Sequence, residues 1–560
     1  MLVMRSEILR TYRKVHTWTG IIAGLFLFIA FYGGAITVFR DPLTRWVDAP
    51  NTAASTDFDR AGDLIAKTLA AHPEAAREFS LLVSEKRDGS VEPARDVQLS
   101  WQKSRRDGAP FSASLDAEGA LKVAQIHPSG LFPFIDIIHR TGGLPFNRDI
   151  GEWIMGVVSG LYFLAVFAGV IIILPALARE IFALRIGPNV KRMWMDVHNL
   201  IGLLSLPFHI VIALTAFVFC LHDLMLPALD KVVFEGRLPA LIKAGNPGSR
   251  PPAANSPPAT MLPPQVLLEK VAALAPDFQP TRMQYRAFGT QTATLTITGF
   301  DPRHMMRLHG SVVVSPVTGD IVNAEYLPGH GGTWATITSA FFALHFASYG
   351  GTPIHFSYLL LGLAGAVLFY SGNLLWIESR RRSERKNGSD VTQTRATRIM
   401  AAITVGVSLG CIAGISSAIV IGKWVSGRVI DPDLWHMTAY YAVFAGCVLF
   451  ALKRGAARAS VELLHFAAVV TAAIPVTCFL AMIFPALKME ADPQINQAVF
   501  IVGLVAALVL FRLAGLTQRR VEEGPADSIW SLASSPEFQV QRRERRFPAL
   551  SLPSIKLRQR

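Results

Sequence analysis

Charged residues are scarce in this chain. Asp, Glu, Lys and Arg make up 17% of its 560 residues, whereas 51% are hydrophobic and the mean hydropathy is +0.36. Soluble globular domains carry about 25% charged residues, so the composition excludes an ordinary soluble enzyme. The net charge is +13, but the basic residues flank apolar runs. This placement indicates membrane topology and argues against nucleic acid as a partner.

Cysteine is equally scarce. All of the cysteines lie inside apolar stretches, at Cys220, Cys411, Cys447 and Cys478, which excludes a disulfide framework and a thiolate metal cluster. The sequence also lacks a dinucleotide-binding G-x-G-x-x-G unit, a P-loop and an H-E-x-x-H motif. The short loops expected in the cytoplasm leave no room for a flavin or nicotinamide domain. Any electrons that this protein moves must therefore come from another protein or from a lipid-soluble quinol.

Long apolar runs are what the sequence has instead. A helix needs about 20 predominantly apolar residues to cross a bilayer. Eight runs of roughly this length lie at 16–39, 153–175, 199–221, 353–377, 399–421, 434–452, 463–486 and 495–516. The first run is too long for a signal peptide and lacks a clean small-residue cleavage site. We therefore expect it to be a retained helix.

Short basic loops predict the orientation of the chain. Clusters of Lys and Arg lie at 179–192, 380–386, 453–458 and 519–520, and eight alternating spans place all of them on the side of the N-terminus. Cytoplasmic loops carry an excess of Lys and Arg. We therefore expect both termini in the cytoplasm, and two long hydrophilic segments, at 41–130 and 223–330, on the opposite side.

The two outer segments are expected to fold as small α+β domains. In the first, a helix is predicted near Ala61–Ala71. In the second, Gln265–Leu274 is amphipathic, and Thr292–Thr298 and Ser311–Ser315 are rich in β-formers.

The predicted fold is an all-α integral membrane protein with about eight transmembrane helices and two inserted α+β domains. The expected units are helix 1 in 1–40, the first outer domain with a pre-helix segment in 41–150, helices 2 and 3 in 151–222, the second outer domain with a Pro-rich linker in 223–335, a re-entrant or surface segment with helix 4 in 336–382, four further helices in 395–520 and a disordered basic tail in 521–560.

The first part of the chain contains an internal repeat. His16 and His198 open the first and third spans, and each is followed by a glycine four residues later. His139 and His345 each precede two glycines, a proline and the next span. The unit of helix, outer domain, histidine segment and helix therefore occurs twice, and helices five to eight show no relation to it. The repeat duplicates histidines at matched depths.

Histidines matched in this way indicate haem sites. Imidazole nitrogen is the usual axial ligand of a b-type haem held between helices. His16 and His198 are expected at cytoplasmic helix ends, and His139 and His345 just before helices that begin on the outer side. One histidine from each repeat copy would ligate each haem iron. We therefore expect two b haems, one near each membrane face.

His209 leaves the assignment of the outer haem open. It lies eleven residues after His198, which on one straight helix is about three turns and about 16 Å along nearly the same face. It could replace His139 or His345 as a ligand, or line the path between the haems. An ionisable residue inside a membrane is a functional candidate by default. Interfacial positions are the simpler interpretation of the other helix-end histidines, His222, His355, His436 and His465.

Two arginines are candidates for binding haem propionates. Arg13 lies beside the inner pair and Arg140 beside the outer pair, and guanidinium groups bind carboxylates with charge-assisted hydrogen bonds. The excess of positive charge at cytoplasmic helix ends explains Arg13 equally well. The sequence leaves both interpretations open.

The motifs resemble those of the bacterial PepSY-associated transmembrane-helix proteins, also called iron-regulated membrane proteins. The resemblance covers about 1–382, and its motifs are His16-x-Trp18-x-Gly20, Asp196-x-His198, Pro207-Phe208-His209, Leu344-His345-Phe346 and Ser315-Pro316-x-Thr318-Gly319-Asp320. It implies PepSY-like outer domains, a bacterial inner membrane and, as in some members, a di-haem reductase that releases iron from ferric siderophores in the periplasm. The histidines that match the family pattern are His16, His139, His198, His209 and His345. The helices after residue 395 depart from the family.

The implied chemistry is simple. Siderophores hold Fe(III) through hard oxygen ligands, and reduction to Fe(II) labilises the complex, so no acid–base machinery is expected. The expected partners are a ferric siderophore, docked between the outer domains and the membrane near His330 and Trp334, a quinol or reductase as electron donor, and the lipid bilayer. The alternatives are a transporter for siderophores or other metal complexes, a regulator whose outer domains bind a periplasmic partner, and a haem electron-transfer protein with another acceptor.

Overall fold

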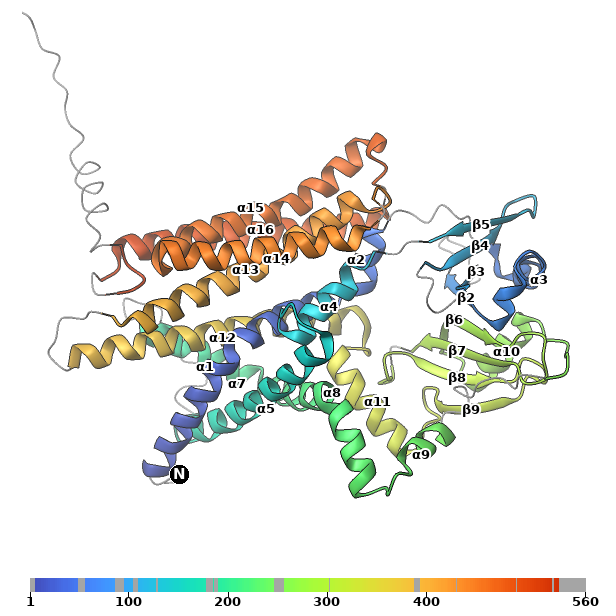
Figure 1. Ribbon diagram of the computed structural model, residues 1–560, viewed down its shortest axis with the longest axis horizontal. Coiled ribbons are helices and arrows are strands. Elements are labelled where there is room, and N and C mark those ends of the chain that lie inside the picture. Colours follow the sequence, from blue (N-terminus) through green and yellow to red (C-terminus); the bar gives the residue numbers. More distant parts are fainter. Residues whose placement is uncertain are drawn as a thin grey trace, which may run out of the picture.

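The fold combines a bundle of long helices with a β-sheet at one end (Figure 1). The computed structural model describes residues 6–48, 56–85, 95–103, 109–126, 129–177, 185, 190–245, 256–301, 303–386, 393–429, 431–489, 491–525 and 528–532. The tail predicted to be disordered over 521–560 is ordered at its start, because the last helix continues to Glu523 and the N–H of Leu532 binds the carbonyl of Val521. The rest of that tail beyond 532 and part of the predicted Pro-rich linker lie outside the described residues. The N-terminal end of the first helix and the sheet lie at opposite ends of the bundle.

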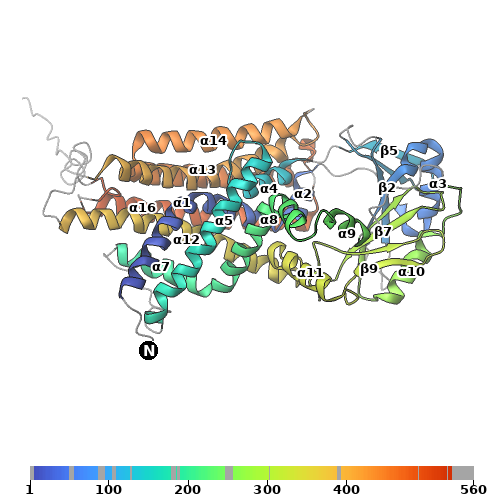
Figure 2. The same cartoon turned by 60° about the horizontal axis from the view of Figure 1, so that its bottom comes forward.

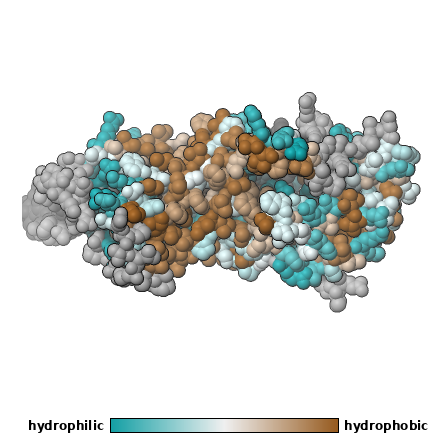
Figure 3. Space-filling view, turned by 90° about the horizontal axis from the view of Figure 1, so that it is seen from below, coloured by the Kyte–Doolittle hydropathy of each residue, from teal (hydrophilic) through white to brown (hydrophobic). Residues whose placement is uncertain are grey.

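Eight helices in the described part of the chain are long and apolar enough to cross a membrane, which confirms the predicted number. They are α1 (Ser6–Thr37), α5 (Arg148–Ile173), α8 (Leu206–Val232), α12 (Gly351–Lys386), α13 (Arg395–Val425), α14 (Pro432–Arg454), α15 (Ala456–Ile483) and α16 (Pro493–Glu523). Figure 3 shows the apolar surface that these helices present, with hydrophilic surface toward both ends of the molecule. The chain is a multi-pass membrane protein.

The third span differs from the prediction, because the helix is interrupted at Ser205. The structure has α7 (Val190–Leu204) before this residue and α8 after it. Pro207 lies in the first turn of α8. In the first turn, the missing N–H of Pro207 costs nothing, because N–H groups there have no partner within the helix. In the interior of a helix continuing from α7, Pro207 would remove one hydrogen bond and its ring would clash with the carbonyl group of Leu203. The prediction that His198 and His209 share one face of one straight helix is therefore wrong.

Shorter helices connect the long ones and cover the sheet. They are α2 (Arg40–Val47), α3 (Ala61–Ala71), α4 (Leu131–Thr141), α9 (Leu238–Gly245), α10 (Pro264–Leu274) and α11 (Thr333–Phe346). The histidine segments of the two repeats are the helices α4 and α11. Both end at a left-handed residue, Gly142 with φ of 63° and Ala347 with φ of 54°. The chain then turns into α5 and α12, so the structure follows the repeat.

The two outer segments do not form separate domains: their strands join in one antiparallel sheet. The strands are β1 (Thr56–Asp57), β2 (Glu78–Glu85), β3 (Arg95–Trp101), β4 (Phe111–Leu115), β5 (Leu121–Gln125), β6 (Gln279–Arg286), β7 (Thr294–Phe300), β8 (Gly310–Val314) and β9 (Ile321–Tyr326). Their order is β5-β4-β3-β2-β6-β7-β8-β9, with β1 paired to β3. The first segment meets the second where β2 pairs with β6, for example Leu81 with Met283.

One hydrophobic core lies under this sheet. Figures 1 and 2 show α3 and α10 side by side on the face that is turned away from the membrane helices. Buried residues of both segments form a single cluster, among them Leu64, Leu81, Leu99, Leu267 and Leu295. An unpaired sheet edge is open to association with other chains. Pairing β2 with β6 removes one edge from each unit and lets both share one core.

The four C-terminal helices pack against the first half of the bundle. Helix α13 contacts both α1 and α12. Cys411 and Ile415 of α13 belong to the same buried cluster as Phe28 of α1 and Ile135 of α4. Helices α13–α16 therefore extend the core of the repeat rather than forming a separate bundle.

The shared core makes a prediction about the stability of the two outer units. Leu81 is fully buried in this core, and replacing it with alanine is expected to cost about 2–5 kcal/mol. We expect L81A to expose both units to protease together, with new cleavage both in 109–126 and in 294–314, in the purified full-length protein. L82A is the matched control, since Leu82 lies on the opposite face of β2 and is only half-buried. New cleavage confined to the first unit would show that the units are independent.

Candidate functional site

The first predicted pair, His16 and His198, is brought together in the structure. His16 lies on α1 and His198 on α7, and their ring centroids are 6.1 Å apart. The Nδ1 atom of His16 lies 2.8 Å from the carbonyl oxygen of Ala165 on α5. The Nδ1 atom of His198 lies 3.2 Å from the carbonyl oxygen of Leu368 and 3.1 Å from the hydroxyl of Ser371, both on α12. Each ring is thus held by a helix other than its own.

The second predicted pair, His139 and His345, is also brought together. His139 lies in the last turn of α4 and His345 in the last turn of α11, with ring centroids 6.4 Å apart. The Nδ1 atom of His139 lies 2.6 Å from the carbonyl oxygen of Ala30 on α1. The Nδ1 atom of His345 lies 2.7 Å from the hydroxyl of Thr215 on α8. Because that hydroxyl donates to the carbonyl of Val211, it accepts the proton of the imidazole.

These partners determine which nitrogen of each ring is protonated. A carbonyl oxygen accepts hydrogen bonds only, so Nδ1 of His16, His139 and His198 must carry the proton, and the Thr215 hydroxyl imposes the same on His345. In a neutral imidazole the other nitrogen, Nε2, then holds a free lone pair. A ring fixed by an Nδ1–H donor bond and presenting Nε2 is the usual state of a metal-ligating histidine. All four rings thus have a protonated Nδ1 and a free lone pair on Nε2.

The spacing of both pairs fits two imidazoles on one metal ion. A ligating imidazole nitrogen lies about 2 Å from the metal and about 1.1 Å from the centre of its own ring, so two axial rings have centroids roughly 6.3 Å apart. The observed separations are 6.1 Å for His16 and His198 and 6.4 Å for His139 and His345. Both separations are compatible with two imidazoles on one iron, as a bis-histidine haem would require.

Glycines leave the space that three of these rings occupy. A Cβ atom on Gly34 would lie 2.8 Å from Cε1 of His139, and one on Gly169 would lie 3.1 Å from Cε1 of His16. Gly372 lies similarly against His198, where the distance would be 3.5 Å. Gly34 of α1 and Gly169 of α5 thus admit a histidine ring where any larger residue would collide with it.

His209 lies between the two pairs. Its ring is 1% exposed and is enclosed by aromatic rings of three other helices, Phe31, Tyr162 and Phe369, as well as its neighbour Phe208. Phe31 follows the carbonyl that binds His139, and Phe369 follows the carbonyl that binds His198. This position agrees with a residue that lines the path between the pairs.

The hydrogen bonding of His209 is incomplete. Its Nδ1 atom lies 2.5 Å from the hydroxyl of Tyr162, and its Nε2 atom is buried without a partner. A buried polar atom left unpaired costs about 1–3 kcal/mol. Such an orphaned nitrogen points to a group that the protein holds beside it, and a haem in the neighbouring pair is one that fits.

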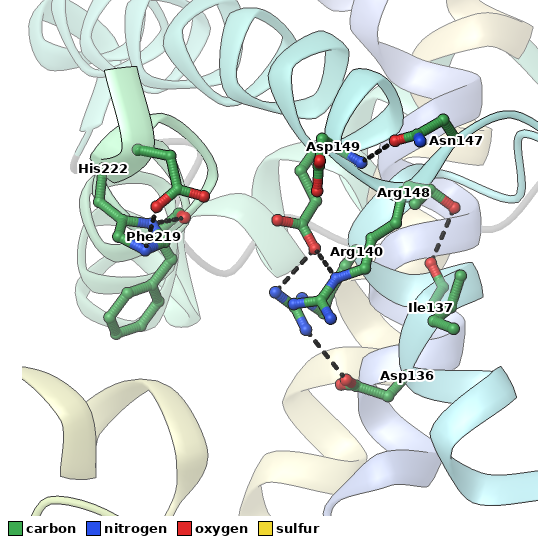
Figure 4. A network of polar contacts seen from close by, with 11 residues as sticks. Asp136, Ile137, Arg140, Asn147, Arg148, Asp149, Phe219 and His222 are labelled. Atoms are coloured by element: carbon green, nitrogen blue, oxygen red, sulfur yellow. Dashed lines mark hydrogen bonds and ion pairs between the residues drawn. The ribbon is translucent and has the colours of Figure 1, made fainter. Parts of the chain in front are cut away.

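The two candidate arginines differ in their surroundings. Arg140 lies next to His139 and forms ion pairs with Glu152 at 2.7 Å and with Asp136 at 3.6 Å; Figure 4 shows Arg140 between Arg148 and Asp136. Arg148 binds the same oxygen of Glu152 at 2.8 Å. The Arg140 charge is therefore matched by protein carboxylates. Arg13 is exposed, as expected for a basic residue at a helix end near the membrane surface.

The remaining helix-end histidines lie apart from the two pairs. His222 and His465 are exposed and bind backbone carbonyls of their own helices. His355 contacts Phe39 with a ring separation of 6.0 Å. His436 differs from the interfacial interpretation, because it is 1% exposed and packs against Phe134.

Sequence reasoning missed the residues that orient the histidines. Thr215 and Ser371 bind imidazole nitrogens, and Tyr162 binds His209. Each is a polar side chain inside an apolar span, and that property is the only signal the sequence gives for it. Near the inner pair, the fully buried carboxylate of Asp196 binds Arg185 and Arg192. This ion pair fixes the start of α7, two residues before His198.

Comparison with known proteins identifies one family. The family model for the PepSY-associated TM region matches residues 13–379. The matched segment contains His16, His139, His198, His209 and His345, and ends before α13. A search of curated proteins finds no match.

The His209 contact yields a stability prediction. Replacing Tyr162 with phenylalanine removes the one hydrogen-bond partner that the buried imidazole of His209 has among the described residues, at an expected cost of about 1–3 kcal/mol. We expect Y162F to lower the apparent Tm of the detergent-purified protein. The control is Y12F, since the Tyr12 ring contacts Phe167 near the exposed start of α1. Equal melting temperatures for the two variants would contradict the prediction.

Proposed function

We propose that this chain, which belongs to the PepSY-associated transmembrane family, is a haem-dependent reductase that delivers electrons across a bacterial inner membrane to ferric siderophores. The observation that carries the proposal is the presence of two histidine pairs, spaced for one iron each, at two depths of one helical bundle. Family membership alone supports a membrane protein of this type. The spacing and hydrogen bonding of the histidine pairs are what support redox chemistry in addition to family membership.

The residues that would hold the cofactors are the four paired histidines. His16 and His198 would hold one b haem, and His139 and His345 the other. When bound, these haems supply one-electron transfer along the bundle. The protein contributes fixed rings with Nδ1–H donated away from the metal, an apolar surrounding and the intervening aromatic residues around His209.

The outer pair lies on the side of the bundle that carries the sheet. α4 and α11 lie toward the sheet in Figure 1, whereas the start of α1 lies at the far end. The positive-inside pattern of the loops supports a periplasmic position for the sheet. A ferric siderophore would dock between the sheet and the membrane, near the exposed Trp334 at the start of α11.

Reduction of the ferric chelate needs little from the protein beyond electron delivery. Fe(III) is held by hard oxygen ligands, and Fe(II) is bound less tightly by the same donors. One electron therefore releases the iron without proton or group transfer. The electron donor is a quinol or another reductase.

The haem content of histidine variants tests the assignment. We expect about two b haems per chain in the purified protein, and about one in either H16A or H139A, because each pair would lose one axial ligand. The measurement is the pyridine-haemochrome content with oxidised and dithionite-reduced spectra. H465A is the matched control, since His465 is an exposed histidine on a membrane helix and its hydrogen bond is to a carbonyl of its own helix. A colourless protein from haem-sufficient cells would refute the proposal.

The acceptor needs its own experiment. We expect the dithionite-reduced protein, freed of excess reductant, to be reoxidised under anaerobic conditions by ferric hydroxamate or catecholate siderophores, with Fe(II) captured by a ferrous chelator. H139A should lose most of this reoxidation, because it disrupts the pair nearest the sheet. Rapid reoxidation by a periplasmic redox protein, without reaction with any ferric chelate, would favour the electron-transfer alternative. Siderophore flux into vesicles without haem would favour a transporter.

A further inference from the structure

Helices α13–α16 have no counterpart in the repeat and lie outside the matched segment 13–379. We propose that they form a positioning unit for α4, which fixes His139 opposite His345 and so sets the geometry of the outer pair. This inference rests on the proposed function, because it assigns the C-terminal helices a role in the outer haem site. It is carried by contacts along the whole length of α4.

The N-terminus of α4 is capped from α14. The backbone N–H of Gly130 donates to the carboxylate of Asp433 at 2.9 Å, although the two residues lie 303 positions apart in the chain. The first N–H groups of a helix have no partner within the helix, and a carboxylate there also interacts favourably with the helix dipole. The carboxylate that caps α4 thus comes from the C-terminal helices.

The middle of α4 packs against α13 and α14. Leu131 is fully buried, and a Cβ atom on Gly422 of α13 would lie 2.9 Å from its side chain. Phe134 contacts His436 and Tyr440 of α14 with ring centroids 5.6 and 5.7 Å apart. This face of α4 is apolar because it is covered by α13 and α14.

The turn after α4 also contacts α14. A Cβ atom on Gly143, whose φ is 73°, would lie 3.1 Å from the hydroxyl oxygen of Tyr440. On the opposite side, His139 binds the carbonyl of Ala30 on α1. Helix α4 is therefore held between α1 and α14 from its first residue to the turn that follows it.

A second connection runs through α2. The ammonium group of Lys423 on α13 donates to the carbonyl oxygen of Trp46, and the indole N–H of Trp46 donates to Asn496 on α16 at 2.9 Å. Two residues further on, Asp48 accepts the N–H of Ser129, which precedes α4. Burial raises the pKa of the Asp48 carboxyl, against the opposing effects of the Ser129 N–H and the Lys423 charge. The approach to α4 is thus fastened to two of the C-terminal helices.

Such support is needed because α4 has 11 residues. Isolated helices of this length are marginal in water, and their order in proteins comes from packing. The position of His139 is therefore set by the neighbours of α4 rather than by α4 itself. The C-terminal helices supply one of these neighbouring surfaces, beside those of α1, α2 and α5.

The test uses Asp433 in the full-length protein. We expect D433A to increase hydrogen–deuterium exchange of the α4 amides about fivefold, the effect of one lost hydrogen bond, and to shift the midpoint potential of the outer haem while leaving that of the inner haem unchanged. D433N should restore both values, because the amide oxygen still accepts the Gly130 N–H. T394A is the control: Thr394 caps the start of α13 through Thr397, at the end of that helix far from Lys423.

The outcomes separate this inference from the proposed function. Unchanged α4 exchange in D433A, or equal shifts of both haem potentials, would overturn the positioning role. A protein that binds no haem would refute the reductase, and the exchange measurement would still decide whether α14 holds α4. Faster α4 exchange in T394A to the same extent as in D433A would also overturn the inference, because it would show general loosening of the bundle.

Discussion

The hydrogen bond from each imidazole Nδ1 to an acceptor on another helix is the interaction on which the rest of the structure depends. A buried N–H must have an acceptor, and within a helical bundle that acceptor is a polar side chain or the second lone pair of a helix carbonyl. His16, His139 and His198 bind backbone carbonyls, and His345 binds the Thr215 hydroxyl. Each bond requires two helices at a fixed distance and rotation. The packing of the helices therefore also determines the direction in which the Nε2 atom of each paired histidine points.

The duplication explains why this constraint is satisfied twice. Each pair takes one histidine from each copy of the repeat, and the sheet forms where β2 of the first copy pairs with β6 of the second. The two copies thus meet at the inner pair, at the outer pair and at the centre of the sheet. A single copy would leave two unpaired histidines in the membrane and an open strand edge outside it. When the two copies associate, both histidines gain a partner and the strand edge is paired.

The sequence predicted the membrane spans and the histidine pairs, because both depend on patterns that can be read directly along the chain. The spans follow from apolar length, and the pairing of His16 with His198 and of His139 with His345 follows from the repeat. The interruption at Ser205 was missed because Pro207 lies within an otherwise continuous apolar run. Joining of the outer units was missed because strand pairing between β2 and β6 depends on edges that the sequence does not mark. The carbonyl partners of the histidines could not be predicted, because every residue has a carbonyl group and the sequence does not distinguish one from another.

The outer pair differs from the inner pair in how its two members are held. α4 is fixed by α1, α13 and α14. By contrast, α11 is fixed by α8 and by the sheet, through Arg307 stacked on Phe342 at 4.6 Å and through the Ser348 hydroxyl bound to Met306. The spacing of His139 and His345 therefore joins two parts of the molecule that are stabilised by different interactions. The C-terminal helices also contact the helices of the inner pair, since α13 packs on α1 and α12 and Arg520 of α16 lies 3.2 Å from the sulfur of Met193 on α7. At the outer pair they contact α4, the short helix that carries His139, both at its first turn and along one face. The helices outside the repeat thus act on the outer pair through the helix that carries one of its two histidines.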